Sequence, residues 1–193
     1  MYQRHRRLIH IVSFIVFATV LLYGVVLFTQ FLLADQQANA FVNQYGYWAV
    51  LVASYVAGLN AIVPIPATSL VPVFLAADLW LPLIIAILVI GTTLADLTAF
   101  GLAVLGRKAA TGKFPKVEAY ARKLHEKKEV HLAIFVFVYA TISPLPNEII
   151  LVPLALAGVK LRVLILPLIV GTIIYQTYFS LTMQGVFNFF VGG

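Results

Sequence analysis

The sequence predicts an all-α integral membrane protein, an inverted repeat of two re-entrant, proline-broken hairpins plus about three transmembrane helices. The first observation is composition: the 193 residues are 62% hydrophobic and 10% charged, with a mean hydropathy of +1.00. Such a chain has too little polar sequence to cover a soluble globule. The second is a Pro-x-Pro pattern that interrupts two apolar stretches, and the third is the clustering of basic residues. We therefore expect residues 1–193 to form a single membrane domain.

The first expected element is a transmembrane helix over residues 1–36. A basic start precedes an apolar run that ends at Leu33. A removed signal peptide is the alternative, because Ala38-Asn39-Ala40 resembles a cleavage site. The apolar run is longer than a signal-peptide core, which has roughly 7–15 residues, and it can cross a bilayer with some tilt. We therefore interpret it as a retained helix.

A hairpin is expected over residues 48–77, after a polar connector, residues 35–47, that contains no Lys or Arg. The apolar run of the hairpin breaks at Pro64 and Pro66, because proline lacks a backbone donor and clashes with the preceding helical turn. The return limb, residues 67–77, would rise about 16 Å as a helix, roughly half of a 30 Å hydrocarbon core. This limb is too short to span, so the chain should leave the membrane on the side from which it entered.

The stretch from residue 79 to residue 105 is long enough to cross the membrane once, and a basic segment over 107–130 follows. We expect this segment to be a cytoplasmic loop. Its second half places apolar residues on one helical face, which is typical of a short helix on lipid headgroups, and a solvated loop is the alternative. Lys123, Lys127 and Lys128 are the side chains expected to contact anionic headgroups.

A second hairpin is expected over residues 131–158, followed by a last crossing over 163–183. Its break contains Pro144 and Pro146, which lie 80 positions after the two prolines of the first hairpin. Paired, proline-interrupted apolar segments in two halves of a chain point to a transporter-type fold with its site at the repeat interface. The same offset recurs in the crossing stretches, where it relates Gly91 to Gly171 and Thr92 to Thr172.

The 13 Lys and Arg residues all fall within residues 1–7, 107–130 and 160–162. Basic residues favour the cytoplasmic side, so these clusters and the N-terminus should lie there together. The hairpin over 48–77 then enters from outside and the hairpin over 131–158 from inside, which makes the two repeats inverted. Non-helical tips are tolerated at membrane depth only where they are buried in protein or line a cavity. The tips should therefore face each other near the midplane.

Only two acidic residues lie inside apolar segments, Asp96 in a crossing stretch and Glu148 beside the second proline break. An ionisable side chain at membrane depth costs about 2.5–3.5 kcal/mol or more and usually marks an ion path, a proton relay or a substrate site. Alternatively, each carboxyl group is a neutral, hydrogen-bonded structural group. The polar neighbours that can hydrogen-bond a headgroup or an ion are Asn60, Thr68, Ser69, Ser143, Asn147 and Gln176.

Signatures of an enzyme or a metal site are absent from the sequence. The four histidines lie at or near the basic clusters, there is no cysteine, and no phosphate-binding or dinucleotide motif occurs. An intramembrane aspartyl protease would need a second aspartate beside Asp96. We therefore expect no enzymatic activity, cofactor or metal site. The net charge of +6 reflects membrane topology here, so nucleic acid is not an expected partner.

Residues 40–183 resemble the DedA/VTT family, also called SNARE-associated, whose members have two opposed re-entrant hairpins. The segment GTTLADLTAFGLAVLGR looks like the family's Gly-x-x-x-Gly-Asp-x-x-x-Tyr…Gly-Arg helix, with Asp96 and Gly106-Arg107 at the matching positions. Phe100 replaces the family's Tyr. VPIPATS and SPLPNEIILVPLALAG resemble the motifs of the first and second hairpins.

This chain departs from the family at both hairpins. Ala67 and Thr68 stand where Gly and an acid are usual in the first hairpin. Many members carry arginines around the second, whereas no Arg occurs here between Arg122 and Arg162, and Glu148 is present instead. Arginine is the side chain suited to bidentate phosphate contacts, so the resemblance does not extend to a phosphate clamp. What remains is an acidic cavity that responds to protons or cations.

The resemblance implies movement of lipid across a membrane, by proton-coupled flippases in some members and by scramblases among eukaryotic relatives. We therefore expect a proton-coupled transporter of lipid or a small amphiphile, with a midplane acidic cavity, in the cell membrane of a prokaryote. Two alternatives stay open: an ion or small-cation transporter, whose substrate Asp96 and Glu148 neutralise, and a non-transporting scaffold that acts through its basic segment. The expected partners are membrane lipids, anionic headgroups at the basic loop and protons, and a homo-oligomer stays open.

Overall fold

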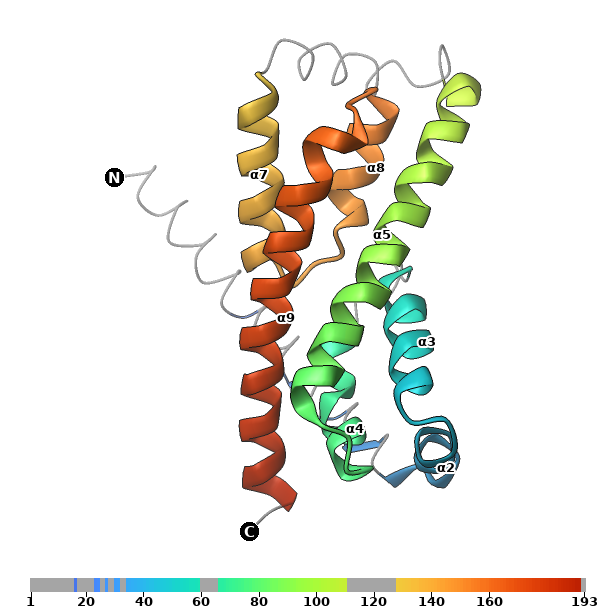
Figure 1. Cartoon of the computed structure of the whole chain (residues 1–193), viewed down its shortest axis with the longest axis vertical. Helices are drawn as coiled ribbons and strands as arrows, with labels where there is room; N and C mark the ends of the chain where they lie inside the picture. The colour runs from blue at the N-terminus through green and yellow to red at the C-terminus, as the bar shows by residue number, and fades with distance from the viewer. Residues whose placement is uncertain are drawn as a thin grey trace, which may run out of the picture.

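The structure, a computed structural model, describes residues 34–59, 66–110 and 128–191, together with single positions nearer the N-terminus. Across these residues every regular element is a helix and no strand occurs (Figure 1). The all-α prediction is therefore confirmed for the described part of the chain. Most of the expected N-terminal helix, residues 1–36, and most of the basic segment, residues 107–130, lie outside it.

Two long helices run along the molecule, α5 over Leu81–Ala110 and α9 over Leu161–Val191 (Figure 1). Among the described residues, the segments 81–107 and 161–185 are long and apolar enough to cross a membrane, judged by length and composition. Pro167 lies inside α9 without ending it. The two crossings that the sequence predicts over residues 79–105 and 163–183 therefore correspond to continuous helices.

A short helix that the sequence did not predict, α2, covers Gln36–Tyr45 within the expected polar connector. Asp35 begins it, because its carboxylate accepts hydrogen bonds from the backbone N–H groups of Gln37 at 2.8 Å and Ala38 at 3.1 Å. Such a cap satisfies donors that the first helical turn leaves without an intrahelical partner. Gly46, with φ of 54°, then ends α2 and begins the next helix. The expected connector is thus a helix, and its Asp cap was the signal for it.

The first helix pair consists of α3 over Tyr47–Gly58 and a return limb made of the 3₁₀ turn η1 over Ala67–Leu70 and α4 over Val71–Ala76. Residues 60–65, which connect α3 to this limb, lie outside the described part of the chain. Pro72 lies at the start of α4, where a missing backbone donor costs little. The return limb is as short as the sequence predicts.

The second helix pair, α7 over Glu129–Ile142 and α8 over Glu148–Leu156, repeats this order before its own long helix. Between α7 and α8 the chain contains Pro144 and Pro146, which prevent a continuous helix. Figure 1 shows α7 and α8 in one half of the molecule's length and α3 and α4 in the other half. The two pairs therefore extend inward from opposite ends of the molecule.

Each long helix packs against both pairs. Helix α5 contacts α3 and α8, whereas α9 contacts α7 and the return limb formed by η1 and α4. The closest approaches occur at glycines. A side chain at Gly91 of α5 would overlap Ser54 of α3, and a Cβ at Gly171 of α9 would lie 2.8 Å from the Ala140 Cβ of α7. Small residues of this kind let apolar helices approach closely, and the same contact is made once in each half.

Two apolar clusters lie on either side of a polar middle. The first surrounds Phe74 and contains the beginning of α5 up to Leu88. The second surrounds Leu151 and contains α5 residues from Phe100 onward. Between these two positions α5 carries Asp96, which is buried. The apolar clusters therefore fix the helices around a central stretch in which polar side chains meet.

Candidate functional site

A cavity of about 80 Å³ lies where α5, α8 and α9 meet, with the end of α3 and the start of η1 in its wall. One water molecule needs roughly 10–15 Å³ of such space, so the cavity holds about five waters. The side chains that give the wall its polar character come from both long helices and from α8. They are Thr92, Asp96, Asn147, Glu148, Thr172 and Gln176.

Asp96 is buried on α5, and its Oδ2 accepts a hydrogen bond from the Asn147 Nδ2 at 2.9 Å. Asn147 immediately precedes α8, where an Asn side chain commonly caps its own helix. No such cap bond forms here, and the side chain reaches across to α5 instead. The hydrogen bond ties the beginning of α8 to α5 and gives the Asp96 carboxyl group a neutral partner.

Glu148 is the first residue of α8, and it lines the same cavity. Both of its carboxyl oxygens are buried, and neither has a hydrogen-bond partner among the described residues. An acidic side chain in a first helical turn interacts favourably with the helix dipole, but a buried charge also needs hydrogen bonds or a counter-charge. The Glu148 carboxyl group is therefore available to interact with a proton, water or a cation in the cavity.

Gln176 joins α9 to α5. Its Nε2 donates to the Thr92 Oγ1 at 3.3 Å, and the Thr92 hydroxyl donates to the Leu88 carbonyl oxygen at 2.7 Å. The Gln176 Oε1 and the Thr172 Oγ1 are buried without a partner among the described residues. The amide of Gln176 is thus oriented so that its oxygen remains available to the cavity.

Tyr175 also lines the cavity, and its hydroxyl has no hydrogen-bond partner within the described part of the chain. Its ring stacks on Phe179, with centroids 5.3 Å apart, and meets Tyr178 edge to face at 5.6 Å. These aromatic contacts hold the phenol ring against the wall of the cavity.

The first helix pair contributes fewer polar groups than the sequence predicts. Thr68 and Ser69 are fully buried in η1 but do not line the cavity. The Ser69 Oγ donates to the Pro66 carbonyl oxygen at 2.7 Å, so its hydroxyl stabilises the turn. Pro66 itself lines the cavity. Asn60 and Pro64 lie outside the described residues.

The second proline break forms part of the cavity wall. Ser143, Pro144 and Pro146 all line it. The Ser143 Oγ accepts a hydrogen bond from the Leu145 backbone N–H at 3.1 Å, which closes the turn between α7 and α8. The Tyr139 hydroxyl donates to the Pro146 carbonyl oxygen at 3.3 Å and fixes the turn against α7. Ser143 therefore shapes the wall, and its hydroxyl group can still donate a hydrogen bond.

Positions that are 80 residues apart in the sequence meet at this cavity. Thr172 and Tyr175 were not among the predicted site residues. The offset was the available signal for Thr172, because it relates this residue to a threonine beside Gly91. No sequence pattern distinguishes Tyr175 from the other tyrosines. The pairs of lining residues with this offset are Pro66 with Pro146, Thr92 with Thr172, and Asp96 with Gln176.

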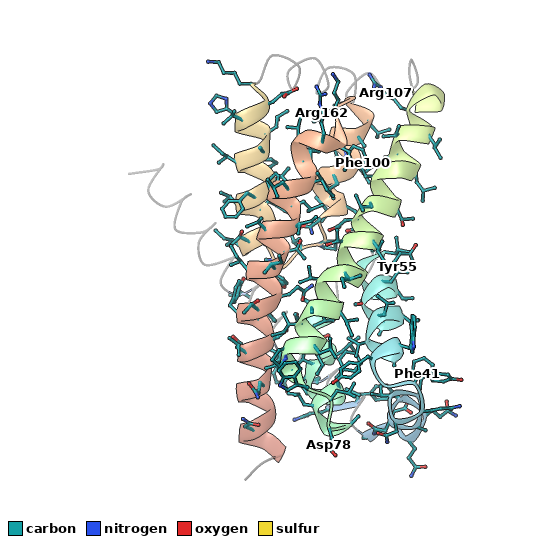
Figure 2. The ribbon with its side chains drawn as sticks, in the orientation of Figure 1. Phe41, Tyr55, Asp78, Phe100, Arg107 and Arg162 are labelled. Atoms are coloured by element: carbon teal, nitrogen blue, oxygen red, sulfur yellow. The ribbon has the colours of Figure 1, made fainter. Side chains whose placement is uncertain are left out.

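The described basic side chains do not line the cavity. Among the described residues that line it, none is Lys, Arg or His. Figure 2 shows Arg107 and Arg162 at one end of the molecule and Asp78 at the opposite end. Lys128 is exposed immediately before α7. The carboxyl groups in the middle therefore have no counter-charge from the described wall.

No family model, curated protein or solved structure matches this chain. The resemblance to the DedA/VTT family stays a prediction from the sequence motifs. Function is therefore inferred from the cavity and from the arrangement of helices around it.

Proposed function

We propose that this protein is an integral membrane transporter that couples protons to translocation of lipid or a small amphiphile through the central cavity. The observation that carries the proposal is a pair of buried carboxyl groups, Asp96 and Glu148, at one cavity without a basic side chain among its described lining residues. Ionisable groups in such surroundings usually mark proton or ion pathways. The other titratable groups that face them are the hydroxyls of Tyr139 and Tyr175, from α7 and α9.

The outer surface supports a membrane location. Large apolar side chains are exposed on α3, α5, α7, α8 and α9, including Leu105 at 79%, Leu166 at 68% and Ile142 at 67% exposure. Soluble monomers rarely expose contiguous apolar surface on this scale, whereas in a bilayer the same side chains contact lipid. In this proposal α5 and α9 cross the membrane, and the two short helix pairs are re-entrant.

The inverted repeat is supported by three correspondences between the halves. Each half has a short helix, a proline break, a short return helix and a long helix. Each long helix has a glycine, Gly91 or Gly171, where it contacts the first short helix of its own half, α3 or α7. Equivalent residues of both halves line the cavity. Transporters with this architecture bind substrate at the repeat interface and expose it to alternate sides by rocking one repeat against the other.

The size of the cavity indicates which state this conformation represents. Its volume of about 80 Å³ is far below the roughly 300–1,000 Å³ of sites that enclose drug-sized ligands. A lipid headgroup therefore has no room beside Asp96 and Glu148 in this conformation. We assign it to a state that is too narrow for a headgroup, from which the two helix pairs must separate to admit one.

Orientation and family membership belong to the same proposal. The end that carries Arg107 and Arg162 faces the cytoplasm of a prokaryotic cell, because basic residues favour that side. Lys128 and, outside the described residues, Lys123 and Lys127 contact anionic headgroups there. The sequence motifs and the mid-membrane acid on α5 fit a DedA/VTT-like transporter that lacks the arginines of the second hairpin.

Reconstitution of the purified protein into lipid vesicles tests this function. Inward and outward movement of a fluorescent phosphatidylglycerol is measured by quenching from outside, with and without an imposed proton gradient. We expect the gradient to accelerate lipid movement in the wild type. Asp96→Asn should abolish the acceleration, and Asp78→Asn, the same change at the far end of the molecule, should retain it. Lipid movement that ignores the gradient in the wild type would contradict proton coupling.

A further inference from the structure

The polar wall of the cavity has more hydrogen-bond acceptors than donors. Each of its two side-chain amide groups uses one N–H within the protein, since Asn147 donates to Asp96 and Gln176 donates to Thr92. Carboxylate and amide oxygens only accept hydrogen bonds, so what they lack is a donor or a cation. The wall oxygens that are buried without a partner among the described residues are the Glu148 Oε1 and Oε2, the Gln176 Oε1, the Thr172 Oγ1 and the Tyr175 hydroxyl.

Three of these side chains are almost completely buried. The exposed fraction is 6% for Glu148, 4% for Gln176 and 3% for Thr172. All three residues line the cavity, and their free oxygens are shielded from bulk solvent. Buried polar atoms in folded proteins nearly always have a partner, which is protein, water or an ion. We therefore expect their partner to bind at the cavity that these residues line.

The charge of the wall favours a cation over a neutral donor. Asp96 and Glu148 both line the cavity, and no Lys, Arg or His accompanies them among the described lining residues. Residues 60–65, which lie outside the described part of the chain, read NAIVPI and contain no basic residue either. When either carboxyl group ionises, its counter-charge must therefore come from a bound ion.

Helix ends add to the negative potential. Helix α3 ends at Gly58 and α7 ends at Ile142, and Gly58 and Ser143 line the cavity. The C-terminal carbonyl groups of such half-helices carry partial negative charge and coordinate cations in inverted-repeat transporters. The N-terminus of α8 also meets the cavity, and Glu148 in its first turn offsets the positive partial charge there.

We infer that the central cavity binds a monovalent metal cation of the size of Na⁺, with oxygens of Glu148, Gln176 and Thr172 as ligands and Asp96 as a second negative charge. A volume of about 80 Å³ accommodates such an ion with a few waters. Divalent cations are disfavoured, because their dedicated sites gather several carboxylates. No group of three or more His, Cys, Asp or Glu suited to a metal occurs among the described residues.

This inference rests on the proposed function, because the cation shares the cavity with the protons that drive transport. The titratable groups that line the cavity are Asp96 from α5, Glu148 from α8 and Tyr175 from α9, and Tyr139 of α7 interacts electrostatically with Glu148.

Binding of radioactive Na⁺ to the purified full chain in detergent, measured by equilibrium dialysis, tests the site directly. We expect saturable binding of one ion per chain. Unlabelled Na⁺ should displace the tracer, whereas K⁺ at the same concentration should displace little of it. Absence of saturable binding by the wild type would overturn the site, and equal displacement by K⁺ would overturn its size assignment.

Variants test the ligands. Glu148→Gln should weaken Na⁺ binding at least about tenfold, in the range usual when support of a metal site is lost. Gln176→Leu should weaken it without any change of charge. Asp78→Asn removes a carboxylate at the far end and should bind Na⁺ like the wild type. Wild-type affinity in both cavity variants would overturn the ligand assignment.

Thermal unfolding gives a second measurement that does not depend on variants. An ion that binds only the folded state raises the Tm, and the Tm increases with the concentration of the ion. We expect the wild-type Tm to rise in sodium chloride relative to choline chloride at equal ionic strength, and an identical Tm in the two salts would overturn the site.

The outcomes separate this inference from the proposed function. Na⁺ binding without proton-dependent lipid movement would support the cation site and overturn lipid transport. Proton-dependent lipid movement by a protein that binds no Na⁺ would overturn the cation site and support the transport function.

Discussion

Asp96 and Glu148 share one cavity but differ in their contacts. Asp96 accepts a hydrogen bond from Asn147, whereas Glu148 has no partner among the described residues. Two carboxyl groups at one small cavity cannot ionise independently, because the charge of one disfavours the charge of the other. A proton taken up at this site therefore belongs to the pair, and transport should depend on both residues.

The first prediction concerns this pair. Asp96→Asn and Glu148→Gln keep the size of each side chain but remove its titration. We expect each variant to flatten the pH dependence of lipid transport while leaving the protein folded in detergent. The double variant should be little worse than the worse single one, because both changes disable the same proton step. The measurement is the pH profile of transport in vesicles, and an unchanged profile in both single variants would assign the two acids a structural role.

The sequence alone reveals those site residues whose burial in an apolar segment costs free energy. Asp96 and Glu148 are identified in this way, and Gln176 is identified by its offset from Asp96. Thr68 and Ser69 do not line the cavity. The Ser69 hydroxyl bonds to a backbone carbonyl of its own turn, whereas the Thr68 hydroxyl is buried without a partner among the described residues. Sequence gives no information on which face of a short proline-flanked turn meets a cavity.

At the level of helices, two glycines set the closest approaches. The Cβ of a residue at 171 would lie 2.8 Å from the Ala140 Cβ and 2.9 Å from the Phe137 carbonyl oxygen. The second of these atoms belongs to the backbone and cannot move without displacing α7. The contact between α7 and α9 therefore depends on the absence of a side chain at this position.

The second prediction tests that contact. Gly171→Val should destabilise the protein by about 1–3 kcal/mol, the usual cost of inserting extra methyl groups into a well-packed interface. Gly101→Ala is the matched control, because a Cβ there has no atom within 4 Å. The thermal unfolding midpoint in detergent should fall for Gly171→Val and stay the same or rise for Gly101→Ala. Equal midpoints would show that α7 and α9 do not pack as described.

The inward face of α9 changes from apolar to polar at the cavity. Toward the basic end, Leu168 is fully buried and apolar. Toward the other end, Thr172, Gln176 and Ser180 follow at intervals of four residues, which places them on one face of the helix. The Ser180 Oγ is buried without a partner among the described residues. If the cavity exchanges protons as we propose, this polar face is our candidate for their path toward the end that carries Asp78.

The third prediction addresses this path. Ser180→Ala should slow proton-driven transport several-fold, because the path loses a hydroxyl that relays hydrogen bonds. Thr182→Val is its control on the same helix, since the Thr182 hydroxyl is exposed and donates to the Tyr178 carbonyl oxygen at 2.9 Å. The Thr182 variant should transport like the wild type in the vesicle assay. A Ser180 variant with wild-type rates would exclude this face as the route.

Sequence predicted the order of the helices better than their contacts. Proline breaks and the lengths of apolar runs indicated which helices are short and which are long. The structure has short and long helices in this order. The helix α2 was missed because its residues are polar, although Asp35 is a good cap. Contacts between helices could not be predicted, because nearly uniform apolar segments have no distinct inward face.

At the level of the whole molecule, the two halves have similar helices but different side chains. Position 96 is Asp in the first half, and its counterpart in the second half is Gln176; Glu148 corresponds to Thr68 in the same way. Each half therefore supplies one acid, from a long helix in the first and from a return helix in the second. If the two halves exchange conformations during transport, the cavity would present different side chains to the two sides of the membrane.

The orientation of the halves gives the last prediction. The chain has no cysteine, so single cysteines can be introduced at Gln37, Ala77 and Lys160 without background. An impermeant thiol reagent added to intact cells should label the first two positions and spare Lys160. After permeabilisation it should label all three.

The comparison between Gln37 and Ala77 is decisive for the first helix pair. Gln37 precedes α3 and Ala77 follows α4, so a re-entrant pair places both on the same side of the membrane, whereas a spanning pair places them on opposite sides. Lys160 is exposed between α8 and α9, beside Arg162 at the basic end, and serves as the cytoplasmic reference. Labelling of Gln37 but not Ala77 in intact cells would mean that α3 and its return limb cross the membrane, and the two halves would then lose their inverted relation.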